Sequence, residues 1–136
     1  MAKAFVDTNV LFYAVDGREG AKQEIAIRLI GDLLQSSQPI ISAQVVHEFL
    51  INIIRKLGLS PEQALTHCAG LREFALAPTT LDTARESLLI MGSASLSFRD
   101  ACIVSAAAQS GCKVLYSEDL NSGQTIAGVK IVNPFL

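Results

Sequence analysis

Acidic side chains follow two predicted strands of this chain at the points where the strands end. Asp7 closes a short β-prone segment at Lys3–Val6, and Glu118 and Asp119 follow a second such segment at Val114–Tyr116. In open α/β sheets, ligand sites form in the crevice beyond the carboxyl ends of the strands. The two strand ends therefore offer carboxylates to one rim, where they could serve a ligand site.

Each acid of interest also has a structural explanation, and the residues alone leave both open. Asp7, followed by two more short polar residues, suits a turn or a helix cap. Glu48 lies away from the apolar stripe of its predicted helix, where solvent would cover it. Asp100 stands three residues after Ser97, as in a capping box, and Asp119 suits a loop. The acids must therefore be judged as a set.

Helical spacing of apolar residues and cap motifs predict the elements that position these acids. The predicted helices cover Ile25–Leu33, a Ser42-capped helix to Leu57 closed by Gly58, a Ser60–Gln63 capping box to about Phe74, a Thr79–Asp82 box to about Met91, and Phe98–Gln109 closed by Gly111. Further short strands are predicted at Ile40–Ile41 and Ile131–Val132, and loops at Gly92–Ser95 and Asn121–Gly128. This order predicts an α/β fold with a mostly parallel sheet flanked by helices.

Length and composition limit the possible classes of protein. The 136 residues suit a single domain spanning 1–136, and the 11 basic and 13 acidic residues leave a net charge of −2. A dominant positive field is excluded, so nucleic-acid binding would need local basic contacts or metal ions. The three cysteines lack zinc or redox spacing, and no apolar run reaches about 18 residues. We expect a cytoplasmic protein with reduced thiols and no membrane association.

Four segments together resemble a known family. FVDTNVL, ISAQVVHEF, LSFRDACIVSAA and VLYSEDL occur in the order and approximate spacing of PIN-domain ribonucleases, especially the VapC-like toxins of type II toxin–antitoxin systems. The resemblance covers nearly the whole chain and implies a PIN-like α/β/α sandwich. It also implies that Asp7, Glu48, Asp100 and Asp119, separated by 41, 52 and 19 residues, converge on one acidic pocket. The register favours Asp119 over its neighbour Glu118.

A pocket of four carboxylates predicts a metal site. Two carboxylates about 4 Å apart repel by about 4 kcal/mol at an effective dielectric of 20, and hard oxygen ligands at neutral pH select Mg²⁺ or Mn²⁺. Such a site suits metal-assisted hydrolysis of RNA phosphodiester bonds. We expect Asp7 and Asp100 to be the main ligands, Glu48 a ligand or water-orienting base, and Asp119 a support. Hydrogen bonds that hold these carboxylates are expected from Thr8, Asn9 and Ser117. One metal or two remains open.

Basic residues at the rim would have to meet the RNA phosphates. Ordinary solvated surface is the favoured explanation for each candidate, and the candidates are Arg18, Lys22, Arg55, Lys56 and Arg99. His47 lies near the edge of the apolar stripe, where a packed or capped side chain is expected, and His67 has no partner pattern. Neither predicts a zinc site.

Other functions fit less well. A haloacid-dehalogenase-type phosphatase needs a second acid where Asn9 stands, and a receiver domain needs an acidic pair near the first strand. A catalytically silent PIN-like module that binds RNA or protein and a housekeeping RNA-processing PIN nuclease remain as alternatives. For a VapC-like toxin, the resemblance implies an antitoxin partner and a homodimer. The surplus of aliphatic residues from Ile25 to Leu57 is compatible with such contacts.

Overall fold

One mixed sheet forms the centre of the molecule. The computed structural model describes residues 2–18 and 20–136. Within these ranges six strands pair in the order β3-β2-β1-β4-β6-β5, and all pairs are parallel except β5 with β6. The strands are β1 (Lys3–Val6), β2 (Gln38–Ser42), β3 (Ala75–Ala77), β4 (Val114–Tyr116), β5 (Thr125–Ile126) and β6 (Val129–Val132).

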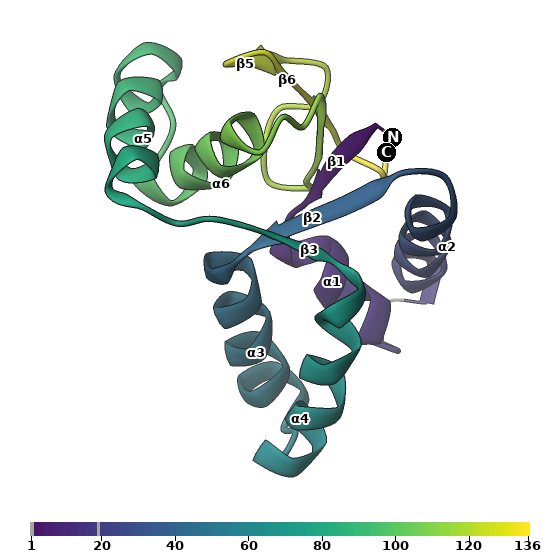
Figure 1. The fold of residues 1–136 in the computed structure, drawn as a ribbon. Helices are drawn as coiled ribbons and strands as arrows, with labels where there is room; N and C mark the ends of the chain where they lie inside the picture. Colours follow the sequence, from purple (N-terminus) through teal and green to yellow (C-terminus); the bar gives the residue numbers. More distant parts are fainter. Residues whose placement is uncertain (1, 19) are drawn as a thin grey trace.

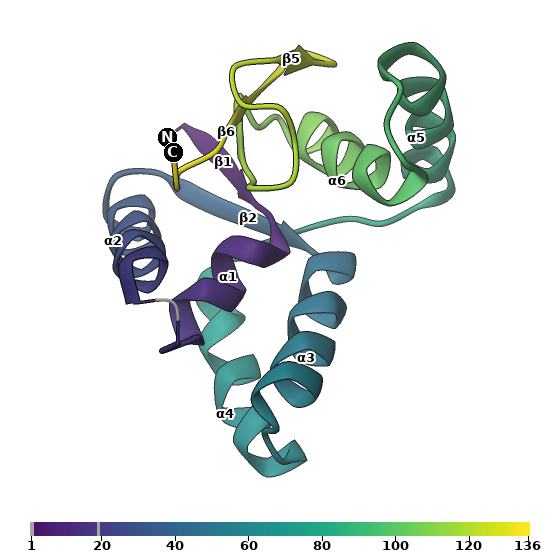
Figure 2. The same ribbon diagram turned by 180° about the vertical axis from the view of Figure 1, so that it is seen from behind.

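Helices cover both faces of this sheet. Figures 1 and 2 show α1 to α4 on one side and α5 and α6 on the other. Their bounds are α1 (Thr8–Val15), α2 (Gly20–Ser36), α3 (Ala43–Leu57), α4 (Pro61–Gly70), α5 (Leu81–Ala94) and α6 (Phe98–Gln109), with a 3-10 turn, η1, at Leu71–Glu73. The predicted α/β sandwich with a mostly parallel sheet is confirmed.

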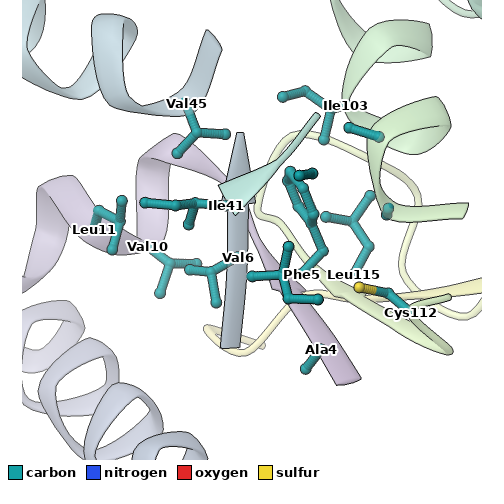
Figure 3. Packing of buried hydrophobic residues seen from close by; sticks show 14 of the residues in the cluster. Ala4, Phe5, Val6, Val10, Leu11, Ile41, Val45, Ile103, Cys112 and Leu115 are labelled. Atoms are coloured by element: carbon teal, nitrogen blue, oxygen red, sulfur yellow. The ribbon is translucent and has the colours of Figure 1, made fainter. Parts of the chain in front are cut away.

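The two faces of β1 build two halves of the core. Successive side chains of a strand point to opposite faces of the sheet. Phe5 lies beside its register neighbour Leu115 and near Ile103 of α6, whereas Val6 lies near Val10 of α1 (Figure 3). All five side chains are fully buried. This packing fixes β1 between the helix layers, and with it the edge at which the strand ends.

The predicted caps of α3 and α4 are confirmed. Ser42 Oγ accepts a hydrogen bond from the Val45 N–H at 3.4 Å, and α3 ends on Gly58 with a left-handed φ of 67°. A left-handed residue at this position suits glycine, which has no Cβ. Ser60 and Gln63 form both bonds of the capping box, at 3.2 and 2.9 Å.

A turn was predicted after Asp7, but the structure has the start of a helix there. α1 starts at Thr8, and Asp7 Oδ1 accepts the Thr8 N–H at 2.7 Å as the helix N-cap. The prediction was incomplete because the first helical pattern recognised was that of Ile25–Leu33, which lies inside α2. The apolar residues of α1 are buried against the sheet and α3, and this burial extends the cap into a helix.

Two short edge strands were not predicted. The helix expected to run to Phe74 ends at Gly70, and η1 then leads into β3, where Ala75 pairs with Ile40. The loop expected at residues 121–128 contains β5, which pairs with β6. Strands this short carry little sequence pattern, and the sheet edge next to them decides their conformation.

α5 starts one residue later and ends later than predicted. Its N-cap is Thr80, and the reciprocal partner is Thr83 in place of Asp82. The helix continues through the expected loop at Gly92–Ser95 to Ala94 and ends on Ser95 with φ 55°. Ala94 in this extension packs against the core, and Ser93 Oγ donates to the Ile90 carbonyl oxygen at 3.3 Å, so the last turn forms despite the low helix propensity of glycine and serine.

No single helix in residues 2–18 and 20–136 is long and apolar enough to cross a membrane. α5 and α6 reach that length and apolar character only together, as a pair bent by 115°.

Candidate active site

The carboxyl ends of β1 and β4 bring Asp7 and Ser117 together. Val6 and Tyr116 pair in register, and Asp7 and Ser117 are the residues that follow them. The Asp7 N–H continues the ladder to the Tyr116 carbonyl oxygen at 3.0 Å. Ser117 Oγ donates to Asp7 Oδ2 at 2.7 Å. The hydrogen bond predicted from Ser117 to a site carboxylate is thus present.

Asp7 is both a helix cap and the deepest acid of the site. Its side chain has no exposed surface, and Oδ1 accepts the Thr8 N–H while Oδ2 accepts the Ser117 hydroxyl. Burying an ionised carboxylate is costly unless it is paired and hydrogen-bonded. Thr8, Ser117 and Arg99 provide those partners, so Asp7 is the N-cap of α1 and at the same time part of the acidic cluster.

Glu48 reaches the same place from α3. Thr8 Oγ1 donates to Glu48 Oε1 at 3.1 Å, which joins α1 to α3 directly above Asp7. The side chain is 30% exposed, so the fully solvated position that helical periodicity favours for Glu48 is wrong. Helical periodicity could not reveal this contact, because it compares residues within α3 only, whereas the partner of Glu48 is Thr8 of α1.

Asp100 enters the site from the first turn of α6. Ser97 Oγ accepts the Asp100 N–H at 3.1 Å, which is half of the capping box considered from the sequence. The Asp100 carboxylate accepts from Arg99 Nη1 at 2.9 Å and is 24% exposed. The cap is therefore made by Ser97, and the Asp100 side chain is turned toward the other acids.

Arg99 is the residue on which these three acids converge. Its Nε and Nη2 bind Glu48 at 3.0 and 2.7 Å, its Nη2 binds Asp7 Oδ1 at 3.0 Å, and its Nη1 binds Asp100. Burial of the guanidinium by itself lowers its pKa, but the hydrogen bonds with Glu48 and the charge of Asp7 outweigh this effect and raise the pKa above its ordinary value. From the sequence, Arg99 is one of five basic candidates for meeting RNA phosphates, with ordinary solvated surface the favoured explanation. The structure places Arg99 in the cleft lining, and its guanidinium contacts the three carboxylates.

Asp119 lies beside this cluster and is exposed. Its Oδ2 accepts from Asn9 Nδ2 at 3.1 Å, and its N–H donates to Ser117 Oγ at 3.2 Å. Asn9 Oδ1 also accepts the Glu118 N–H at 3.1 Å. The predicted supporting roles of Thr8, Asn9 and Ser117 thus correspond to observed hydrogen bonds, while Asp119 stands apart from the carboxylates held by Arg99.

A second ionic cluster on the adjacent loop was not predicted. Glu118 accepts from Lys22 Nζ at 2.6 Å and from the Tyr13 hydroxyl at 2.7 Å. Burial by itself raises the pKa of Glu118, but the hydrogen bonds from Lys22 and Tyr13 outweigh it and lower that pKa. Lys22 also stacks over the ring of Tyr13, with Nζ 4.8 Å from its centroid. The cluster anchors the loop that carries Asp119. It was not predicted because Glu118 and its two partners are about 100 residues apart in the sequence.

An open cleft of about 510 Å³ lies over the site. It is lined by Thr8, Asn9, Phe12, Tyr13, Glu48, Ile51, Asn52, Lys56, Arg99, Glu118 and Asp119. Lys56 is one of the five basic candidates for the rim, and its Nζ lies 5.3 Å from the centroid of the Phe12 ring. Of the four predicted acids, the cleft is lined by Glu48 and Asp119, whereas Asp7 lies buried beside it.

The other predicted basic residues and the histidines lie differently. Arg18 pairs with Asp16 at 2.8 Å, and Arg55 is exposed near the end of α3. His47 is exposed on α3, so its predicted packed or capped environment is wrong. His67 lies in the last turn of α4.

The acids of the site are chemically suited to bind a cation, but in this structure their oxygens are not arranged around a metal site. Carboxylate oxygens are suitable ligands for a hard divalent ion. Within the described part of the chain, however, no group of three or more histidine, cysteine, aspartate or glutamate side chains is arranged to hold a metal ion. The guanidinium of Arg99 contacts Asp7, Glu48 and Asp100, and their oxygens are turned toward it.

Solved structures with the same fold include a toxin–antitoxin complex and a toxin. A chain of a toxin–antitoxin complex from Klebsiella pneumoniae is 21% identical with a TM-score of 0.75, over 96% of this chain and 97% of that chain. A chain of DNA-bound VapBC from Salmonella typhimurium is 22% identical with a TM-score of 0.69, over 96% and 97%. VapC20 from Mycobacterium tuberculosis, described as a sarcin–ricin loop cleaving toxin, is 23% identical with a TM-score of 0.62, over 85% and 89%. Comparison with curated protein sequences gave no match.

The family is decided by the sequence model that matches the chain. The PIN domain model matches residues 4–124, which include Asp7, Glu48, Asp100 and Asp119. The VapC-like resemblance of the four motifs agrees with the fold of these solved structures. The chain belongs to the PIN domain family.

Proposed function

We propose that this protein is a divalent-metal-dependent endoribonuclease and the toxin of a toxin–antitoxin pair. The observation that carries the proposal is the convergence of Asp7, Glu48 and Asp100 on one cationic group at the carboxyl edge of the sheet. The open cleft above them would admit a single RNA strand. The names of the similar solved structures, which include toxin–antitoxin complexes and an RNA-cleaving toxin, support the same proposal.

Each acid has a proposed role that follows from its position. Asp7, Glu48 and Asp100 would hold Mg²⁺ or Mn²⁺, which when bound would activate water and neutralise charge on the scissile phosphate. Thr8 and Ser117 keep two of these carboxylates in place through the bonds described above. Asp119, held by Asn9 at the edge of the cleft, would act on the site directly or through water.

Two residues of the cleft are suited to the RNA itself. Lys56 carries a positive charge on the same wall as Asn52, and both face the space beside Glu48. A lysine there would attract a phosphate next to the scissile one, which offsets the repulsion between the acids and the RNA.

The proposal is tested by cleavage of a mixed RNA pool with and without Mg²⁺ or Mn²⁺. We expect cleavage by the wild-type protein that chelation with EDTA abolishes. D7N and D100N should lose at least about 100-fold in rate, since each removes a carboxylate from the site. D82N is the matched control, because Asp82 lies in the exposed first turn of α5 and should leave the rate unchanged.

Equal trace activity in wild type, D7N and D100N would instead favour a catalytically silent PIN-like module. Circular dichroism of each variant separates loss of activity from loss of folding. Calorimetric titration with Mn²⁺ tests the ligand assignment by itself: we expect binding to wild type and none to the D7N/D100N double variant.

The toxin role has its own test, because a housekeeping RNA-processing nuclease would have the same site. We propose a cognate antitoxin encoded by a neighbouring gene as the protein partner, and a homodimer as the assembly. Expression of the chain alone should arrest growth, co-expression of the neighbouring small protein should relieve the arrest, and D100N should be harmless. Light scattering should give twice the chain mass. Normal growth under expression of active wild-type protein would favour the housekeeping alternative.

A further inference from the structure

Arg99 lies where a cation bound by the three acids would have to be. We propose that its guanidinium is a built-in competitor of the divalent metal, so that the acids exchange Arg99 for the metal ion. The inference rests on the proposed metal-dependent function and adds to it a self-blocked state of the same site.

The contacts of Asp7 leave no room for both cations. Oδ1 has the Thr8 N–H and Arg99 Nη2 as partners at 2.7 and 3.0 Å, and Oδ2 has Ser117 Oγ and Arg99 Nη1 at 2.7 and 3.5 Å. The side chain of Asp7 is fully buried beneath these groups. Magnesium would need an oxygen at about 2.1 Å, which is closer than the guanidinium. A metal ion therefore reaches Asp7 only after Arg99 has moved.

Glu48 leads to the same conclusion. Arg99 forms a fork of two bonds to its carboxylate, at 3.0 and 2.7 Å, so both oxygens of Glu48 are engaged. Planar two-bond pairing of this kind is the strongest arginine–carboxylate geometry. Three carboxylates and one guanidinium leave a formal charge of −2, whereas the same carboxylates with a divalent ion leave −1, so the exchange neutralises more of the charge of the cluster.

The position of Arg99 in α6 allows its side chain to move away from the three acids. It is the second residue of the helix, where the helix dipole disfavours a positive charge, so the acids rather than the helix hold the side chain in place. The side chain is 33% exposed and lines the cleft. A long side chain in that position can turn into the cleft without disturbing the backbone of α6.

The competition is tested by calorimetric titration of Mn²⁺ into the full chain. If the exchange-competent state holds about a tenth of the wild-type molecules, R99Q should bind Mn²⁺ about tenfold more tightly, because apparent affinity scales with the competent fraction. R99K, which keeps the charge but not the fork, should lie between the two. R85Q is the matched control: Arg85 is exposed on α5 and pairs only with Glu86 among the contacts described, so its affinity should equal that of wild type.

Thermal unfolding provides a second readout that does not depend on catalysis. Without metal, R99Q should unfold at a lower temperature than wild type, since three carboxylates lose their common partner. Added Mn²⁺ should raise its unfolding temperature more than that of wild type. If R99Q does not fold, R99K carries the same test, with an expected gain of a few-fold in Mn²⁺ affinity.

The outcomes separate this inference from the proposed function. Equal or weaker Mn²⁺ binding by R99Q and R99K overturns the competition while the metal site stands. Absence of binding in wild type, R99Q and R99K at millimolar Mn²⁺ overturns the metal site itself, and the competition with it.

Discussion

A single hydroxyl connects two acids of the site. Ser117 Oγ donates to Asp7 Oδ2 and accepts the Asp119 N–H, and the serine side chain is fully buried. It therefore fixes the orientation of the Asp7 carboxylate and the start of the loop that carries Asp119. At the scale of the residue, the geometry of this site depends on the uncharged side chains around the acids as well as on the acids.

Replacing Ser117 by alanine should impair activity more than folding. Removing a group that orients a metal ligand costs about 10- to 100-fold in affinity or activity, and a buried unpaired acceptor costs about 1–3 kcal/mol. We expect S117A to lose activity to that extent and S117T to recover most of it, measured as kcat/KM on RNA alongside thermal unfolding. S36A, on the exposed end of α2, is the control. Activity of S117A within twofold of wild type would contradict the positioning role.

At the scale of the element, the N-terminus of α6 presents a cation and an acid side by side. The Ser97 cap fixes the first turn, so that Arg99 and Asp100 both face the carboxyl edge of the sheet. The rest of α6 is apolar and rich in alanine, and its burial keeps the first turn of the helix at this edge of the sheet. The sequence predicts the pattern of this helix, and the family resemblance implies that Asp100 enters the site, but the contacts of Arg99 with the three acids were not predicted.

Loss of the Ser97 cap should destabilise the protein measurably. An N-cap serine replaced by alanine costs about 1 kcal/mol, whereas aspartate can replace the cap. We expect S97A to lower the free energy of unfolding in urea by about that amount and S97D to restore it. S93A, near the exposed end of α5, should stay within about 0.5 kcal/mol of wild type. If S97A matched S93A, the observed hydrogen bond would contribute nothing to stability.

At the scale of the whole molecule, the core holds one titratable thiol between α6 and β4. Cys112 is 3% exposed, and its N–H donates to the Ala107 carbonyl oxygen at 3.0 Å. Burial raises the pKa of this thiol from 9.0 to about 11, against a smaller lowering by Lys3. The folded protein therefore keeps a proton that the unfolded chain releases at lower pH.

This difference predicts a loss of stability at alkaline pH. The contribution of the thiol is complete below about pH 9 and is lost as pH rises toward 11, because the unfolded state then binds fewer protons than the folded state. The loss should be on the order of 2 kcal/mol over this range. Urea unfolding of wild type and C112A at pH 7, 9 and 10 should show a steeper decline for wild type, and C68A, in the half-buried part of α4, should behave as wild type. Parallel declines in wild type and C112A would rule out the contribution of Cys112.

The sequence alone determined the positions of the strand ends, the main helices and the four acids. Those features follow from local periodicity, caps and motif order, which act over a few residues. The tertiary structure decided where the side chains point. The bonds from Arg99 to Glu48 and Asp7 join residues 51 and 92 positions apart, and the Ser117–Asp7 bond spans 110. β3 and β5 likewise exist because a neighbouring strand offers its edge. Contacts this distant carry no local pattern, so the sequence offers Arg99 only as one of five basic candidates for the rim. Its contacts with the three acids exist because the sheet brings its partners together.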